Sequence, residues 1–228
     1  MGSMGVIPDA STWPDQDLVF WSVGLEPELL VEGYAAGAFP MPTGELAETG
    51  DPLIGWYSPV ARGILPLDAL RVTRSLRKSA RHYRLSIDHC FDQVVERCAD
   101  PNRSGGWIDD EIKRVYGELH RLGLAHSVET WDAAGRLVGG LYGVGLGGLF
   151  AGESMFHDPE HGRDASKVAL IALVELLGRD GHRRLLDVQW QTPHLSGLGV
   201  VEVSRADYLN RLGRALRMPS PQWQLPQV

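Results

Sequence analysis

Hydrophobic and polar positions alternate clearly in the segment 185–190, whose letters are LLDVQW. Successive side chains of a strand point to opposite faces, so Asp187 and Gln189 lie side by side on one face. The apolar neighbours indicate a buried strand, where an unpaired carboxylate would be costly. We therefore interpret Asp187 and Gln189 as a functional pair, against the alternative that Asp187 is a surface residue of an edge strand.

A glycine-rich apolar stretch comes earlier, at 137–156, with the letters LVGGLYGVGLGGLFAGESMF. The pattern predicts two strands, 137–144 and 149–156, which form a hairpin around the glycines at 145–148. The seven glycines of this stretch allow the backbone to come close to a neighbouring strand or a ligand. Glu153 is the one carboxylate here, and we expect it either to join Asp187 and Gln189 or to neutralise a cation.

Spacings of three and four between apolar residues predict the helices. These lie at 27–36, from 88 to about 98, from about 108 to 122, at 167–179, and after the capping sequence at 204–207. Strands are expected at 54–57, 124–131 and 200–203. The segment 9–17 is expected to be loosely ordered and 192–199 to be a loop, and the prolines of 39–42 are expected to exclude regular structure.

The order of these elements favours an α+β fold over a doubly wound parallel sheet, because hairpin-linked strands flank a central buried helix. We expect a small N-terminal domain, residues 1–68, and a larger acyltransferase-like domain, residues 69–228, with a mainly antiparallel sheet. With 43% hydrophobic and 22% charged residues, the chain can bury a sizeable core. No apolar run approaches the roughly 20 residues of a membrane span and no export leader is recognisable, so the cytoplasm is the expected location.

A basic segment at 71–84, RVTRSLRKSARHYR, stands out because the net charge of the whole chain is −7. Its cations, which no acidic residue accompanies, are Arg71, Arg74, Arg77, Lys78, Arg81 and Arg84. In a helix, spacings of three and four would place most of them on one face. This pattern indicates a phosphate-binding surface, with a merely solvated helix face as the alternative.

Several catalytic arrangements are missing from the sequence. We find no G-x-S-x-G elbow, no cysteine placed as a nucleophile, no Walker loop and no dinucleotide fingerprint. His157, His161 and Asp164 have no fourth ligand and no H-E-x-x-H frame, so no metal site is expected. Acyl transfer from an already activated donor remains, in which Asp187 would orient an amine and Gln189 would offer an acceptor and donors.

The chain also contains a series of short motifs, which are, in order, W-Y-S-P, G-G-W-I, L-V-G-G-L-Y-G-V, A-G-E-S-M-F, D-A-S-K, L-D-V-Q and T-P-H-L. In these motifs it resembles the bacterial leucyl/phenylalanyl-tRNA-protein transferases, from about Leu29 to Leu212. The resemblance implies a small N-terminal domain and a GNAT-like C-terminal domain. It also implies transfer of Leu or Phe, with Met as a further option, from aminoacyl-tRNA to the N-terminal Arg or Lys of a protein. That transfer marks the acceptor for degradation by the N-end rule pathway and requires neither a cofactor nor a metal.

The resemblance further assigns roles to individual residues. Asp187 and Gln189 would position or deprotonate the acceptor α-amino group, and Glu153 would lie near this amine or near the basic side chain of the acceptor. The pocket for the aminoacyl side chain would include Leu141, Phe150 and Leu173. Contacts with tRNA would come from Trp107 and from the basic segment 71–84.

The chain departs from the family pattern at several positions. Met41 stands where the family usually has Trp, so stacking on the terminal adenosine would fall to Trp56 or Tyr57. The segment 157–163 carries extra residues. Two other functions stay open from the residues alone: a coenzyme A-dependent N-acyltransferase, and a tRNA-binding or RNA-binding module without catalysis.

Overall fold

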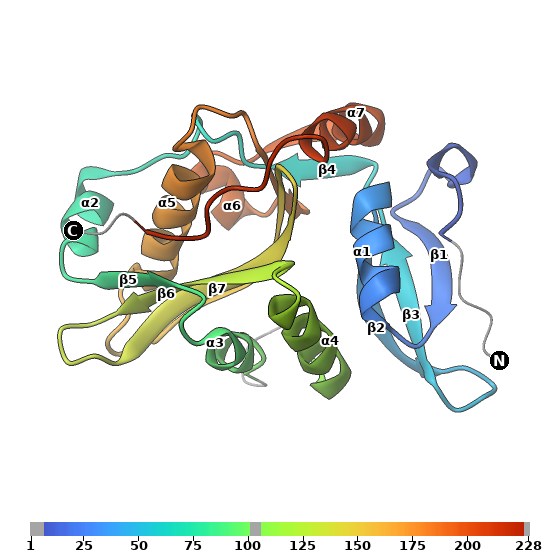
Figure 1. Cartoon of the computed structure of the whole chain (residues 1–228), viewed down its shortest axis with the longest axis horizontal. Coiled ribbons are helices and arrows are strands. Elements are labelled where there is room, and N and C mark those ends of the chain that lie inside the picture. The colour runs from blue at the N-terminus through green and yellow to red at the C-terminus, as the bar shows by residue number, and fades with distance from the viewer. Residues whose placement is uncertain (1–6, 101–105, 226–228) are drawn as a thin grey trace.

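The structure is a computed structural model that describes residues 7–100 and 106–225. It contains two parts, a three-stranded sheet covered by one helix and a seven-stranded sheet with helices on both faces (Figure 1). The α+β class and the mainly antiparallel sheet predicted from the sequence are confirmed. No helix in the described ranges is long and apolar enough to cross a membrane.

The smaller part has an antiparallel sheet with the order β1-β3-β2. Its strands are β1 (Leu18–Val23), β2 (Phe39–Leu46) and β3 (Pro52–Tyr57). Helix α1 (Pro27–Ala36) covers one face and ends, as predicted, at Gly37 in the left-handed conformation. Gly33 is required in this helix, because a Cβ there would lie 2.0 Å from the ring of Trp56. The indole therefore fills the interface between α1 and the sheet.

The lead-in is more ordered than predicted. A short 3-10 helix, η1 (Ala10–Thr12), is followed by Trp13, which is buried. The Asp17 carboxylate accepts hydrogen bonds from Trp190 Nε1 at 2.9 Å and from the backbone N–H of Val60 at 2.9 Å. The prediction of a loosely ordered lead-in is therefore wrong, because one buried tryptophan and one carboxylate anchor it.

The larger sheet has the strand order β10-β4-β9-β8-β7-β6-β5. Its strands are β4 (Ala61–Ile64), β5 (Arg84–Ile87), β6 (Ala125–Trp131), β7 (Leu137–Leu146), β8 (Leu149–His157), β9 (Leu185–Gln189) and β10 (Val201–Ser204). Within the described ranges, β8 and β9 are the one parallel pair, and α5 (Ala165–Gly178) connects them. The hairpin of β7 and β8 is present as predicted, whereas β1, β4 and β5 were not expected. The domain boundary between residues 68 and 69 stays a prediction. Strand β4 precedes this boundary in the chain, yet it pairs with β9 and β10 of the larger sheet.

Helices cover both faces of the larger sheet. One face carries α3 (Phe91–Cys98) and α4 (Asp110–Arg121), and the other carries α5 together with α2 (Arg74–Ala80) (Figure 1). The last helix, α7 (Arg205–Ala215), contacts β4, β9 and β10. One apolar cluster continues from the α3 and α4 side into the smaller part, and a second lies between the sheet and α5. As predicted, α5 is largely buried.

Three local predictions are wrong. The segment 39–42 lies in β2 despite its prolines, because β2 is an edge strand, where missing backbone donors are tolerated. The segment 192–199 contains a helix, α6 (Pro193–Leu198), whose first turn is capped by the side chain of Thr192. The helix predicted to begin at 88 begins instead at Phe91, and the Asp88 carboxylate accepts a hydrogen bond from the backbone N–H of Ser127 in β6.

Candidate active site and basic surface

Strands β8 and β9 stop pairing where the predicted polar residues begin. Their parallel pairing ends at Ala151 and Asp187. Glu153 and Gln189 each lie two residues beyond that last pair, and Gln189 Nε2 donates a hydrogen bond to Glu153 Oε1 at 3.4 Å. The structure therefore brings the two predicted residues together across the split between the strands.

Asp187 is completely buried, which confirms that its strand is a buried one. Arg62 of β4 donates to it twice, from Nε to Oδ1 at 2.8 Å and from Nη2 to Oδ2 at 2.6 Å. The Tyr208 hydroxyl donates to Oδ2 at 2.9 Å, and the backbone N–H of Gln189 donates to Oδ1 at 3.0 Å. Each carboxylate oxygen thus accepts two hydrogen bonds, which leaves no open position for a substrate.

Arg62 is also fully buried. Its guanidinium carbon lies 4.8 Å from the centroid of the Phe39 ring and 4.3 Å from that of Tyr208, and Nη1 donates to the carbonyl oxygen of Gly37 at 3.2 Å. Burial is the largest single influence and lowers the pKa of Arg62, but the charges and hydrogen bonds of its neighbours, led by the charge of Asp187, together raise the pKa above its usual value. The pair therefore remains an ion pair inside the protein.

Gln189 has a backbone conformation that is rare outside glycine, with a φ of 59°. A residue held in this region costs on the order of 1 kcal/mol. The hydrogen bond from its N–H to Asp187 Oδ1 stabilises this conformation at the end of β9. Asp187 therefore fixes the backbone from which the Gln189 side chain reaches Glu153.

Glu153 is half-buried between two buried tyrosines. Tyr34 of α1 donates to Oε1 at 2.6 Å and Tyr116 of α4 donates to Oε2 at 3.0 Å. Burial raises the pKa of Glu153 to about 7, against the lowering effect of the two hydroxyl hydrogen bonds. At neutral pH the carboxyl and carboxylate forms are both populated, which suits a group that gives or takes a proton.

The three residues expected to line an aminoacyl pocket lie in one apolar cluster between the sheet and α5. They are Leu141 of β7, Phe150 of β8 and Leu173 of α5, all buried. Met155 and Val188, which are half-buried, pack against this cluster from β8 and β9. The apolar cluster therefore extends along both strands that border the split. The role of its members as a pocket stays a prediction.

Trp56 offers no surface on which a base can stack. It is fully buried, its ring stacks on Phe20 with centroids 5.3 Å apart, and its Nε1 donates to Ser22 Oγ at 2.8 Å. The expectation of stacking on Trp56 is therefore wrong, because alternation along β3 turns this side chain toward α1. Its neighbour Tyr57 is half-buried and lies edge-on to Trp190 at 5.7 Å.

Trp21 of β1 is an exposed aromatic residue that was not predicted from the sequence to contact tRNA. Half of its side chain, 50%, is accessible. Trp21 and Met41 both pair with Gly55, from either side, and a Cβ on Gly55 would lie 3.4 Å from the Trp21 ring and 3.0 Å from Tyr57. The Trp21 indole therefore lies against the backbone of Gly55, in register with Met41 across the three-stranded sheet. The predicted tRNA contact Trp107 is half-buried just before α4.

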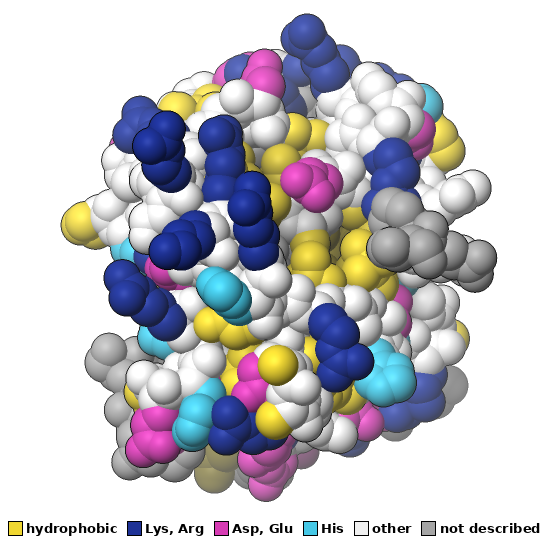
Figure 2. Space-filling view, turned by 90° about the vertical axis from the view of Figure 1, so that its left-hand side faces the viewer, with side chains coloured by type: hydrophobic (Ala, Val, Ile, Leu, Met, Phe, Trp, Pro, Cys, Tyr) yellow, Lys and Arg dark blue, Asp and Glu magenta, His cyan; other side chains and the backbone are white. Residues whose placement is uncertain are grey.

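The six cations of the segment 71–84 are all exposed. Helix α2 is shorter than this segment, so it holds only Arg74, Arg77 and Lys78, with Arg81 directly after its end. Arg71 precedes the helix and Arg84 begins β5, so one helix face does not carry all six. The side of the molecule on which α2 lies nevertheless shows a concentration of basic side chains (Figure 2).

Four residues of the site were not predicted, namely Arg62, Tyr34, Tyr116 and Tyr208. A signal for Arg62 exists in the letters VARGIL at 60–65, because an arginine among apolar strand residues requires a buried anion. The tyrosines carry no such signal. They occupy ordinary core positions, and only the folded structure shows that their hydroxyls converge on two carboxyl groups.

These features fit the class of protein expected from the sequence, an α+β enzyme of the acyl-transfer type, with a carboxyl and an amide facing each other at a split in its sheet. Residues 64–213 match the family model described as leucyl/phenylalanyl-tRNA protein transferase, and residues 24–60 match the model of its N-terminal domain. The chain belongs to this family, and the resemblance stated from the motifs is confirmed.

Individual relatives agree with this assignment over most of their length. The chain is 47% identical over 200 residues to the leucyl/phenylalanyl-tRNA–protein transferase of Rhodospirillum rubrum. The aligned region covers 86% of this chain and 90% of that relative. It is 49% identical over 198 residues to the protein of the same name from Rubrobacter xylanophilus, covering 85% and 96%. The predicted transferase activity class is therefore confirmed.

Proposed function

We propose that this protein transfers leucine or phenylalanine from aminoacyl-tRNA to the N-terminal arginine or lysine of an acceptor protein. The observation that carries the proposal is the contact between Gln189 and Glu153 at the split of β8 and β9, supported by the buried pair of Asp187 and Arg62. The transfer would mark the acceptor for degradation by the N-end rule pathway. Because charged tRNA is a cytoplasmic molecule, the proposal includes the predicted cytoplasmic location.

The reaction forms a peptide bond without a covalent enzyme intermediate. The neutral α-amino group of the acceptor attacks the carbonyl carbon of the aminoacyl ester, and the bond from that carbon to the ribose oxygen breaks. The amine loses one proton and the ribose oxygen gains one. Gln189 would accept a hydrogen bond from the amine through its side-chain carbonyl oxygen, while its Nε2 stays on Glu153. The carboxylate form of Glu153 would supply the negative charge that a cationic acceptor requires.

Asp187 is a positioning residue in this proposal. Both of its oxygens are occupied by donors from Arg62, Tyr208 and the backbone of Gln189, so it would not take the amine proton itself. It holds the strained backbone of Gln189, and Arg62 balances its charge.

The donor would occupy three further features. The cluster of Leu141, Phe150 and Leu173 would accept the aminoacyl side chain. The exposed ring of Trp21, rather than Trp56, would stack on the terminal base. The cations of the segment 71–84 and Trp107 would contact the tRNA, where phosphate contacts and stacking suffice for a single-stranded end.

The test is transfer of labelled leucine from Leu-tRNA to a peptide that begins with Arg, beside the same peptide beginning with Ala. Transfer to the Arg peptide alone is the expected result. Gln189→Ala and Glu153→Gln should each lower kcat/KM by about 100-fold or more. Glu175→Gln, at an exposed carboxylate of α5, is the matched control and should keep wild-type activity. Tight tRNA binding by a wild-type protein that transfers nothing would contradict the proposal, and so would transfer that requires an acyl-coenzyme A donor.

A further inference from the structure

We propose that Trp223, in the segment after the last helix, forms the closed end of the aminoacyl pocket and sets the size of the donor side chain, an inference that rests on the proposed function. The segment after α7 turns back along the larger sheet beside α5 (Figure 1). There Trp223 packs against the apolar cluster that contains Leu141, Phe150 and Leu173. The sequence gave no indication of a role for this tryptophan.

Glycines of β7 make room for the rings of this cluster. Alternate residues of the strand face α5, and these are Gly139, Leu141, Gly143 and Gly145. A Cβ on Gly143 would lie 2.7 Å from the Phe150 ring, and a Cβ on Gly145 would lie 2.9 Å from the Trp223 ring. The centroids of these two rings are 5.6 Å apart. Phe150 and Trp223 therefore lie side by side along β7, each against a bare stretch of backbone.

Trp223 lies on the side of Phe150 that faces away from the split in the sheet. Strands β8 and β9 pair from Leu149 to Ala151 and separate beyond that point. Phe150 is thus in the paired part of β8, where its partner on β7 is Gly145, the glycine that the indole covers. A donor side chain that enters from the split therefore meets the Phe150 ring first, and the indole supports that ring from behind.

The Trp223 ring is held in place by His126 of β6. The two rings stack with centroids 3.8 Å apart and planes 15° apart. His126 is buried, with Nδ1 at 2.7 Å from Asp88 Oδ2 and Nε2 at 3.2 Å from a backbone carbonyl oxygen. Arg179, at the end of α5, donates from Nη1 to the carbonyl oxygen of Gln224 at 2.8 Å. Both the indole and the main chain that carries it are therefore anchored to the domain.

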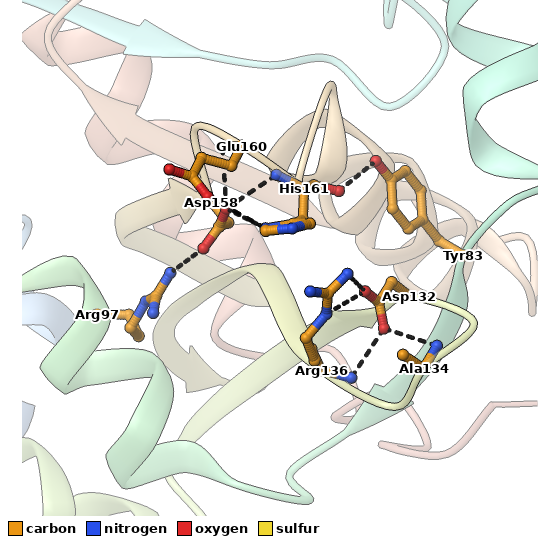
Figure 3. Close-up of polar contacts among 8 residues, drawn as sticks. All are labelled: Tyr83, Arg97, Asp132, Ala134, Arg136, Asp158, Glu160 and His161. Atoms are coloured by element: carbon orange, nitrogen blue, oxygen red, sulfur yellow. Dashed lines mark hydrogen bonds and ion pairs between the residues drawn. The ribbon is translucent and has the colours of Figure 1, made fainter.

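The opposite end of the cluster is fixed by the start of α5. A Cβ on Gly139 would lie 2.5 Å from the Cβ of Ala165, so the helix rests directly on the strand there. The loop before the helix is held by Asp158, whose Oδ1 accepts from the backbone N–H groups of Glu160 at 3.0 Å and His161 at 2.9 Å (Figure 3). These contacts oppose a shift of α5 that would admit a larger side chain. The depth of the pocket therefore depends on the end that Trp223 closes.

Trp223→Ala tests this inference through the choice of donor. The variant leaves space behind Phe150 that leucine does not fill but an indole can. We expect kcat/KM for Leu-tRNA to fall about tenfold, mainly through a higher KM, and the ratio of kcat/KM for Trp-tRNA to that for Leu-tRNA to rise about tenfold or more. Trp223→Phe should give an intermediate ratio. Trp131→Ala removes another half-buried tryptophan, from β6, and as the matched control it should keep the wild-type ratio.

Binding of unreactive donor analogues provides a measurement that does not need catalysis. Leucyl-adenosine and tryptophanyl-adenosine in which an amide replaces the ester present the two side chains without a leaving group. Titration calorimetry should show that Trp223→Ala changes the ratio of the two dissociation constants by about tenfold in favour of the tryptophanyl analogue. The wild type should bind the leucyl analogue more tightly than the tryptophanyl one.

Two results would overturn the inference. One is a wild-type donor ratio in Trp223→Ala that unfolds cooperatively, and the other is an equal rise of the ratio in Trp131→Ala, which would indicate a general loosening of the domain. If Trp223→Ala does not fold, the ratio in Trp223→Phe decides. If the wild type transfers neither amino acid, the proposed function fails, while the binding ratios still decide whether Trp223 limits the pocket. A wild type that binds neither analogue would overturn both.

Discussion

The Arg62→Met variant examines the buried ion pair beneath the site. Methionine keeps an unbranched apolar stem against Phe39 and Tyr208 but removes both hydrogen bonds from the guanidinium to Asp187. The carboxylate would keep only the Tyr208 hydroxyl and the N–H of Gln189 while remaining fully buried. Breaking a buried pair in this way costs about 3–5 kcal/mol, because one charge is left uncompensated.

This free energy should be visible in thermal and urea unfolding. In a chain of this length, about 1 kcal/mol lowers Tm by about 2–4 °C, so Arg62→Met should lower Tm by roughly 10 °C. The double variant Arg62→Met/Asp187→Leu removes both charges and should regain about half of the lost stability, since apolar replacement of a buried pair is often neutral. It should nevertheless remain inactive, because Gln189 has then lost the acceptor for its N–H.

The two single variants and the double variant form a double-mutant cycle, measured by urea unfolding at pH 7. Arg183→Met, at an exposed arginine, is the control and should change stability by less than about 0.5 kcal/mol. Two results would contradict a strongly coupled buried pair. One is a loss of less than about 1 kcal/mol in the free energy of unfolding of Arg62→Met, and the other is a loss in the double variant that equals the sum of the losses in Arg62→Met and Asp187→Leu.

Two further predictions concern Glu153 and Trp21. The wild-type kcat/KM should rise with pH through about 7 as the Glu153 carboxylate forms, and Glu153→Gln should remove this step. Folding favours the protonated form of Glu153, because its pKa is 4.5 in the unfolded chain and about 7 in the folded protein. The free energy of unfolding of the wild type should therefore fall by roughly 3 kcal/mol, relative to that of Glu153→Gln, as the pH rises from 4.5 to 7. Free energies of unfolding that change with pH in the same way in the wild type and in Glu153→Gln would contradict this prediction. Trp21→Ala should raise KM for Leu-tRNA about tenfold, because stacking contributes about 1–3 kcal/mol, with little change in Tm. Trp56→Ala should instead destabilise the fold by about 3–5 kcal/mol, and an unchanged KM in Trp21→Ala would place the base elsewhere.

Periodicity predicted those elements whose packing repeats along the chain. The apolar stripe of α4 and the alternation of β9 each repeat often enough to be recognised. Strands β4, β5 and β10 span four residues each, which is too short for alternation to be a dependable signal, and of the three only β10 was predicted. The prolines of β2 were misjudged because an edge position depends on strand order, which local sequence does not contain.

The same limit explains which part of the site could be predicted. Asp187, Gln189 and Glu153 are polar residues in apolar strands, so the letters around them reveal them. Arg62 lies 125 positions from Asp187 along the chain, and the pairing of the two follows only from β4 lying beside β9 in the sheet. Trp21 was not predicted because the sequence of β1 alone does not show which face of the strand is covered by a helix and which face stays exposed.

Asp187 and Gln189 were predicted as equal neighbours, and the end of the parallel pairing makes them unequal. Asp187 is the last residue of β9 that pairs with β8, so its carboxylate is enclosed by the sheet and needs a cation, which Arg62 supplies from the next strand. Gln189 lies beyond that point, where β8 no longer covers it, and its neutral amide needs no counter-charge to remain there. In the proposed function, burial therefore makes the charged member of the pair, Asp187, a positioning residue, and the neutral member, Gln189, would be the one that contacts the substrate.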